Sequence, residues 1–338
     1  MKTVKQFLPA IYIGLFVVAA AIVAGTTFVN YYLIMPGKSF AGPVPPLSAE
    51  EQRMSVDLEK YVRHLAVTIG ERNLHHPAQL AAASEFIRSQ LQSYGWNVET
   101  QSFQQNGMQF ENLIVERRGE TKPDEIVVIG AHYDSAPNCP AANDNGTGVA
   151  ALLCLARQFK SQTSPRTLRF VAFTNEEPPF FGGKGMGSYQ YAQSCKAGKE
   201  NIVAMLSLET LGYYCDKPGT QLYPPGLNLL YPDRGNFIGF VGTLSAAPLV
   251  RDCVKYYRDL KNFPCEGGSA PAWIEGVDWS DHKNFSSLGY PALMVTDTAV
   301  FRYPYYHTSQ DTPEHVNFGK LARVTTDLAK LISHLTSR

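Results

Sequence analysis

Several imidazole and carboxylate side chains stand just beyond apolar segments of this chain. Each segment is typical of a strand buried on both faces, and open α/β sheets bind ligands in the crevice beyond the carboxyl ends of their strands. We therefore expect these side chains to meet at one edge of a sheet. They are His132, Asp134, Asp144, Glu176, Glu177, Glu209 and His307.

The residue types in this set favour zinc. Imidazole and carboxylate are both good zinc ligands, whereas magnesium and calcium prefer oxygen alone. Neighbouring side chains in an extended segment point in different directions, so of Glu176 and Glu177 one can bind a metal while the other acts as a free base. Asp144 stands at a tight turn and a helix start, where nearby amides can orient its carboxylate.

The elements that would hold these residues alternate between strands and helices. This alternation predicts one α/β domain over residues 49–338, with a mixed, largely parallel central sheet flanked by helices. Strands are expected at residues 96–103, 112–117, 125–130, 168–174, 202–208 and 291–296, and helices at 48–69, 76–94, 146–159, 185–193, 247–260 and 318–337. The segments 215–240 and 263–279 are expected to be pocket loops.

The first 36 residues differ from the rest. Residues 7–35 carry no charge and follow Lys2 and Lys5, and about 20 such residues suffice to cross a bilayer. The lysines favour a cytoplasmic N-terminus. We expect a membrane anchor over residues 1–36, a linker rich in proline and glycine over 37–48, and a domain outside the cytoplasm. A signal peptide, cleaved near residues 19–25, is the alternative and would give a secreted protein.

Composition excludes some classes of protein. Thirty basic residues balance thirty acidic ones, and no basic cluster interleaves with aromatic residues, so no nucleic-acid partner is indicated. The six cysteines include no C-x-x-C pair, which argues against zinc fingers and thioredoxin-like chemistry. Cys139 is expected to line the pocket without a catalytic role, because no base is suggested for it.

At these residues the chain resembles the co-catalytic zinc aminopeptidases, a family that also includes glutaminyl cyclases and glutamate carboxypeptidases. The resemblance covers about residues 50–338 and implies a zinc-exopeptidase-like fold with two zinc ions per chain. It also takes in GERN at 70–73 and SDHKNF at 280–285. The main motifs are AHYDS (131–135), ANDNGTG (142–148), NEEPPFFG (175–182), SLETLGYY (207–214) and YHTSQDT (306–312).

The resemblance implies a metal role for five positions of this sequence. Asp144 would bridge the two zinc ions. His132 and Glu209 would complete one site, and Glu177 and His307 the other. Many relatives have Asp where this chain has Glu209, and the longer side chain should still bind.

Three further roles follow from the resemblance. Asp134 would hold His132 through its other ring nitrogen, as carboxylates beside metal-bound histidines do. Glu176 would be the general base, and Tyr306 would be the phenol that steadies the oxyanion. The family commonly has a cis peptide bond after the bridging residue, so we expect one after Asp144.

The implied reaction is hydrolysis of the N-terminal peptide bond of a peptide with a free amine. The first alternative is a glutaminyl cyclase, which uses a similar scaffold with one zinc to close an N-terminal glutamine on itself. Cyclases commonly have Trp before the last histidine ligand, and this chain has Tyr306. Another peptidase or carboxypeptidase is a further alternative. The last is a non-enzymatic binding ectodomain, although every metal position is filled here.

Simpler structural roles compete for several residues. His132 could be a buried structural histidine, and Asp144 could be a helix cap. Asp281 follows a serine at an apparent helix start and is expected to be a cap. Asp297 and Asp311 lie near residues of the predicted site. Either of them could serve the site or only shape a loop, and the sequence favours the two roles equally.

Overall fold

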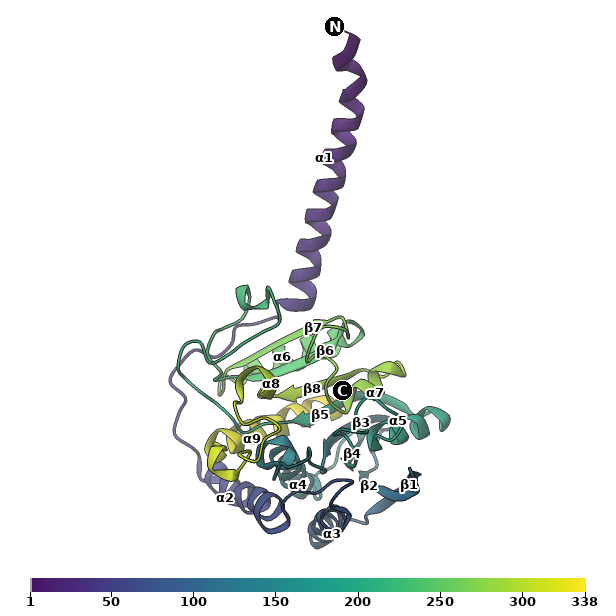
Figure 1. The fold of residues 1–338 in the computed structure, drawn as a ribbon, viewed down its shortest axis with the longest axis vertical. Coiled ribbons are helices and arrows are strands. Elements are labelled where there is room, and N and C mark those ends of the chain that lie inside the picture. The colour runs from purple at the N-terminus through teal and green to yellow at the C-terminus, as the bar shows by residue number, and fades with distance from the viewer. Residues whose placement is uncertain (1) are drawn as a thin grey trace.

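The computed structural model of the chain describes the backbone of residues 2–338 and the side chains of residues 14–338. A long helix, α1 (Lys2–Phe28), projects from an α/β domain in which helices cover both faces of a twisted sheet (Figure 1). The fold confirms the predicted class. Lys2 and Lys5, which set the expected orientation of the anchor, lie where only the backbone is described.

The sheet has eight strands in the order β1-β2-β4-β3-β5-β8-β6-β7. Its centre, β4-β3-β5-β8, is parallel, and so is the β6–β7 pair. The pairs β1–β2, β2–β4 and β6–β8 are antiparallel. The sheet is therefore mixed and largely parallel, as predicted. The strands are β1 (Glu99–Gln105), β2 (Met108–Arg117), β3 (Lys122–His132), β4 (Arg166–Phe173), β5 (Asn201–Glu209), β6 (Ile238–Thr243), β7 (Cys265–Ala270) and β8 (Ala292–Thr296).

The central strand β3 is apolar along its second half because both of its faces are covered. Val127 and Ile129 belong to the large core on one face, and Ile126 and Val128 to a smaller core on the other. Full burial of such side chains contributes roughly 1.5–3 kcal/mol each. The continuous apolar run in the sequence thus encodes a central position in the sheet.

The helices divide between the two faces. Helices α2, α3, α4, α6 and α9 pack over the large core, and α5 and α7 over the smaller one. The predicted capping box of α2 is present, with Ser48 and Glu51 each accepting from the other's backbone amide. The helices after α1 are α2 (Ala49–Arg63), α3 (Pro77–Ser93), α4 (Gly148–Phe159), α5 (Gly187–Ala197), α6 (Ala247–Asp259), α7 (His282–Ser287), α8 (Ala299–Arg302) and α9 (Phe318–Thr336). Short helical turns are η1 (Val29–Leu33), η2 (His64–Ile69), η3 (Ala142–Thr147), η4 (Leu227–Leu229), η5 (Leu244–Ala246) and η6 (Pro313–His315).

Two strands were not predicted from the sequence: β7 lies within the expected loop 263–279, and β6 begins within the expected loop 215–240. The strands β6 (IGFVGT) and β7 (CEGGSA) contain glycines instead of a run of branched apolar residues. At Gly267 a Cβ atom would come within 2.5 Å of Val254 Cγ2 on α6, so the helix approaches too closely for a side chain. The packing that requires glycine thus also removes the usual signal of a strand.

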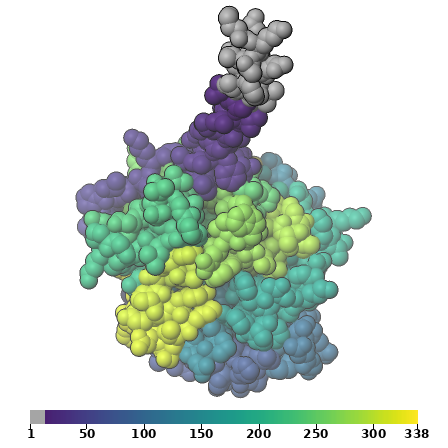
Figure 2. Space-filling view, turned by 45° about the horizontal axis from the view of Figure 1, so that its top comes forward, coloured from purple at the N-terminus to yellow at the C-terminus, as the bar shows by residue number. Residues whose placement is uncertain are grey.

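The segment after α1 lies along the domain. Met35 is buried in the core, and Arg258 of α6 donates hydrogen bonds to the carbonyls of Met35 (3.0 Å) and Gly37 (3.1 Å). Further on, Arg323 donates to Pro46 O (3.0 Å). Figure 2 shows this stretch, in purple, lying on the green surface formed by the middle of the chain. The expected linker therefore follows the domain surface closely.

Candidate metal centre

The predicted residues come together beyond the carboxyl ends of the central strands. β3 ends at His132 and β5 at Glu209, while Glu176 and Glu177 follow β4 closely. All of them are buried except His307, whose side chain is 33% exposed. With Asp144 in η3 and His307 after α8, five chain segments deliver potential ligand atoms to one place.

The first group of contacts forms around His132. Its Nε2 lies 3.3 Å from Asp144 Oδ1 and 3.3 Å from Glu209 Oε2. Glu176 Oε2 is farther from the same nitrogen, at 4.0 Å. These distances between potential ligands suit a cation held among the atoms of His132, Asp144 and Glu209.

The second group forms around His307. Its Nε2 lies 3.1 Å from Asp144 Oδ2 and 3.1 Å from Glu177 Oε2. Asp144 therefore presents one carboxylate oxygen to each histidine, which is the geometry of a bridging carboxylate. A third combination, His132 with Glu176 and Glu177, also brings its atoms within 4.8 Å of one another, so spacing alone does not separate the two glutamates.

Asp134 contacts the side chain of His132 and the backbone of Glu176 and Glu177. Its Oδ1 lies 3.3 Å from Nδ1 of His132, the ring nitrogen that does not face Asp144 and Glu209. The same carboxylate accepts hydrogen bonds from the backbone amides of Glu176 and Glu177, each at 3.0 Å. One buried carboxylate thus connects the end of β3 to the turn after β4.

The backbone conformation around Asp144 fixes the position of its carboxylate. It lies in η3, where the peptide bond to Asn145 is cis, as expected from the family resemblance. Asp311 accepts from the amides of Asn143 (2.8 Å) and Asp144 (3.0 Å) and from the hydroxyl of Tyr303 (2.7 Å). Asp311 therefore shapes the loop that carries Asp144. By shaping this loop it also serves the site, so the two roles left open for Asp311 are one.

Asp297 also shapes a loop beside the cluster. It accepts from Asn143 Nδ2 (2.9 Å) and from the backbone amide of Tyr213 (2.7 Å).

Cys139 is buried, and burial raises the pKa of its thiol. The thiol is therefore kept protonated, and a thiol is a much weaker nucleophile than a thiolate.

Two supporting residues were missed at the level of sequence. Arg72, from the GERN motif, is fully buried and donates to the carbonyls of Tyr133 (2.7 Å), Pro140 (2.8 Å) and Ala141 (3.0 Å). Ser280, from SDHKNF, donates to Glu209 Oε2 (2.8 Å). Membership of a family motif was the only signal for both, because neither contact involves neighbours in the sequence.

The prediction that Asp281 caps a helix is wrong. The residue precedes α7, but its side chain makes no capping hydrogen bond, and it is fully buried. Burial raises the pKa of Asp281 to about 6, against the opposing effect of His132 nearby. The carboxyl group thus belongs to the surroundings of the metal cluster and not to the helix end.

The acids and imidazoles of the cluster shift one another's proton affinities strongly. Burial raises the pKa of Glu177 to about 7, that of Glu209 to about 8 and that of Glu176 well above its usual range. Burial alone would lower the pKa of His132, but Glu209 and the other carboxylates raise it well above the ordinary value. Such mutual perturbation is typical of groups gathered for metal binding or catalysis.

The donor set fits zinc. Among the described side chains, Nε2 of His132, which faces the cluster, and Oε1 of Glu177 are buried without a hydrogen-bond partner. Buried polar atoms are rarely left unpaired, and a metal ion satisfies such atoms. The centre contains nitrogen and carboxylate oxygen only, which is a combination that zinc accepts and magnesium or calcium does not favour.

A largely apolar cavity adjoins the cluster. Glu209 and Tyr306 line it, and Phe237, Val241 and Phe301 contribute to its wall. The Tyr306 ring stacks on the His307 ring, with 3.9 Å between their centroids. Burial raises the pKa of Tyr306, so its phenol keeps the proton that a hydrogen-bond donor needs.

A mixed α/β sheet with imidazoles and carboxylates gathered at its carboxyl edge defines the zinc-exopeptidase-like class of proteins. Residues 112–332 match the family model described as peptidase family M28, and the chain belongs to this family. The predicted relationship to the co-catalytic zinc aminopeptidases is therefore confirmed.

The chain covers different shares of the length of its named relatives. The chain is 36% identical over 284 residues to the uncharacterized protein YfbL of Escherichia coli K12, which covers 81% of this chain and 86% of that protein. It is 28% identical over 221 residues to aminopeptidase YwaD of Bacillus subtilis, covering 62% of this chain but only 41% of that relative.

Solved structures share the fold at low identity. BSAP, a zinc aminopeptidase from Bacillus subtilis, superposes with a TM-score of 0.65 at 14% identity, covering 87% of this chain and 97% of that one. The glutaminyl cyclase of Bacteroides thetaiotaomicron superposes with a TM-score of 0.63 at 18% identity, covering 86% and 99%. The same scaffold thus carries two activities, and the likeness in structure does not choose between them.

Proposed function

We propose that this protein is a membrane-anchored zinc aminopeptidase that hydrolyses the N-terminal peptide bond of peptides. The observation that carries the proposal is the position of Asp144, whose two carboxylate oxygens face two separate histidines. In this proposal His132, Asp144 and Glu209 hold one zinc ion, and Asp144, Glu177 and His307 hold the second. Two bound zinc ions would polarise the scissile carbonyl and lower the pKa of the attacking water.

Glu176 is the proposed general base. Its carboxylate is buried at the edge of the cluster, and Asp134 holds its backbone amide, so the side chain has a fixed place beside the ligands. It lies farther from His132 Nε2 than the proposed ligands do, at 4.0 Å, which leaves it free to face the attacking water. The carboxylate would take a proton from that water and deliver it to the leaving amine.

Tyr306 is the proposed oxyanion donor. Its ring forms part of the cavity wall beside Glu209, and stacking on His307 limits its rotation. A protonated phenol at this place could donate a hydrogen bond to the carbonyl oxygen as negative charge develops on it. Such a donor, oriented before the reaction, stabilises the transition state more than the substrate.

The same scaffold supports glutaminyl cyclization as a second candidate. Glutaminyl cyclases are among the proteins whose structures superpose on this chain. Tyr306 stands where cyclases commonly have Trp, and two groups of three ligand candidates that share Asp144 offer places for two ions instead of one. Both features favour the peptidase.

A parallel assay separates the two candidates. The purified full chain would be given aminoacyl-anilides and peptides with N-terminal glutamine, and zinc per chain would be counted by mass spectrometry. We expect release of amino acids with two zinc ions bound. Formation of pyroglutamyl peptides with one zinc ion and no release of amino acids would refute the proposal in favour of the cyclase.

A further inference from the structure

Two arginines of α6 fix the end of α1 to the domain. Arg251 donates to the carbonyls of Tyr31 (2.7 Å) and Ile34 (3.0 Å), and its guanidinium lies 4.9 Å from the centroid of the Tyr31 ring. Arg258 donates to the carbonyl of Met35 at 3.0 Å. These are carbonyls that a helix end leaves without partners, so the arginines both satisfy them and set the direction of α1.

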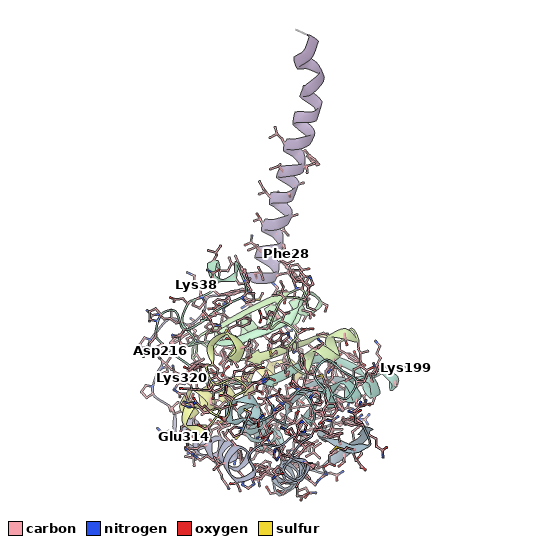
Figure 3. All side chains as sticks on the ribbon, in the orientation of Figure 1. Phe28, Lys38, Lys199, Asp216, Glu314 and Lys320 are labelled. Atoms are coloured by element: carbon pink, nitrogen blue, oxygen red, sulfur yellow. The ribbon has the colours of Figure 1, made fainter. Side chains whose placement is uncertain are left out.

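A loop of the domain, residues 223–231, lies against this end of α1. The hydroxyl of Tyr231 donates to Leu33 O (2.8 Å) and to Gly267 O (3.0 Å), which connects α1, the loop and β7. Tyr223 stacks on Tyr231 with 5.7 Å between the ring centroids. In Figure 1 the loop is the green turn beside the lower end of α1, and Figure 3 places Phe28 at the same end of the molecule.

The loop is apolar and partly unburied. Its sequence, YPPGLNLLY, contains no charged residue. The side chain of Leu229 is 83% exposed and that of Leu230 is 41% exposed. Single exposed leucines are common on soluble proteins, but an uncharged loop flanked by tyrosines is typical of segments that enter a membrane interface.

The end of α1 marks the level at which a bilayer would meet the domain. The stretch Gly14–Leu33 is long and apolar enough to cross a membrane, and its side chains from Gly14 to Phe28 are exposed. Tyr31 and Tyr32 lie at its end, where tyrosines collect at the boundary between lipid and water. Because Tyr231 is bonded to Leu33, the loop stands at this same level.

We propose that residues 223–231 dock on the phospholipid bilayer that α1 crosses, with Leu229 and Leu230 inserted among the lipid headgroups. The proposal rests on α1 staying in the membrane as the anchor of the proposed function. Docking depends on position as well as on composition: the arginines hold the domain in one orientation, and that orientation directs the loop toward the lipid. Apolar side chains of this kind lie about 5–10 Å deep at the boundary of headgroups and acyl chains.

Docking would bring the cavity beside the metal centre to the membrane surface. Leu33 and Leu227 line the same cavity as Glu209 and Tyr306. One wall of the cavity is therefore built from the same residues that would meet the bilayer. A peptide adsorbed at the lipid surface would then have a short way to the proposed catalytic residues.

Lipid quenching of a fluorescent label tests the docking on the full chain. Cys215 is partly exposed and the other cysteines are buried, so Cys215→Ser gives a background with little labelling. In this background an environment-sensitive dye is attached through Leu229→Cys, Val17→Cys or Val67→Cys. The protein is placed in nanodiscs of phosphatidylethanolamine and phosphatidylglycerol, with or without lipids that carry a nitroxide near the glycerol end of the acyl chain.

The three positions make the outcomes distinct. Val17 lies on α1 and reports whether the anchor is in the membrane. Val67 is 64% exposed on η2, which continues α2 at the far end of the domain (Figure 1). A label at Val67 reports any attraction of the dye itself to lipid. We expect loss of fluorescence and a blue shift at Leu229 and quenching at Val17, with neither change at Val67. Quenching at Val17 without quenching at Leu229 would overturn the docking and leave the anchor intact.

Two other results would also overturn the docking. Cross-linking of Leu229→Cys between two copies of the chain, without lipid quenching, would show that a second copy covers the loop. Absence of quenching at both Val17 and Leu229 would remove the anchor together with the docking. Neither result would bear on peptide hydrolysis, which is measured separately on soluble substrates.

Discussion

The adjacent acids Glu176 and Glu177 allow the proposed mechanism to be tested with two nearly identical changes. In Glu176→Gln and Glu177→Gln the side chain keeps its size and loses its charge. Asp134 accepts from both backbone amides at 3.0 Å, so the turn that carries the two residues should persist in either variant. Each change therefore reports the role of one carboxylate and not the collapse of the loop.

The expected magnitudes follow from the contacts of each residue. Glu177 Oε2 lies 3.1 Å from His307 Nε2, within the proposed second zinc site, and Glu177→Gln should lower the zinc content toward one ion per chain. Glu176 makes no such close contact, and Glu176→Gln should keep both ions. Loss of a positioned general base should lower its kcat by roughly 10²- to 10⁴-fold, or about 3–5 kcal/mol of barrier.

The assay measures zinc per chain and kcat on one aminoacyl-anilide for the wild-type protein and both variants. Binding of a substrate-like inhibitor to Glu176→Gln serves as the control for an intact site. Near-normal turnover in Glu176→Gln would refute its role as the base. Zinc loss in Glu176→Gln with full retention in Glu177→Gln would show that the two roles are reversed.

Three further outcomes are expected. Removal of metal with a chelator should abolish peptide hydrolysis and lower the melting temperature, because the acids would lose the ions that balance them; unchanged activity would contradict a metal mechanism. Arg72→Met should lower the free energy of unfolding by about 3 kcal/mol or more in denaturant titrations, since the carbonyls of a buried loop lose their donors. A chain that begins at Val29 should unfold at higher denaturant than one that begins at Gly37, because only the first keeps Met35 in the core, a contribution of about 2–5 kcal/mol; equal midpoints would show that the contact contributes nothing.

The parallel centre of the fold could be predicted because its strands are covered on both faces. The continuous apolar runs of β3, β4, β5 and β8 follow directly from that position in the sheet. The strands β6 and β7 escaped prediction for a physical reason, since Gly267 leaves room for α6 and removes the branched residues that signal a strand. A pattern that depends on a neighbouring helix cannot be recognised within six residues of sequence.

The site also divides into residues that the sequence predicted and contacts that only the folded structure reveals. The ends of apolar strands located His132, Asp144, Glu209 and His307, and the family resemblance assigned a metal role to each of them. The contacts of Arg72 join segments separated by more than 60 residues, as in the bond to Tyr133 O, and local sequence does not encode them. Asp281 was misread because a serine and an aspartate before a helix are usually caps, whereas here tertiary burial carries the side chain into the cluster.

The attachment of α1 to α6 has a mechanical consequence. Arg251 and Arg258 bond to the carbonyls of Tyr31, Ile34 and Met35, in and just after the η1 turn that continues α1, so a change in the tilt of α1 would rotate the whole domain through the same angle. The tilt of a transmembrane helix responds to the thickness of the hydrocarbon layer. Bilayers of different thickness would thus hold the cavity entrance at different inclinations to the lipid surface, so that membrane composition would adjust access to the enzyme without any ligand binding to it.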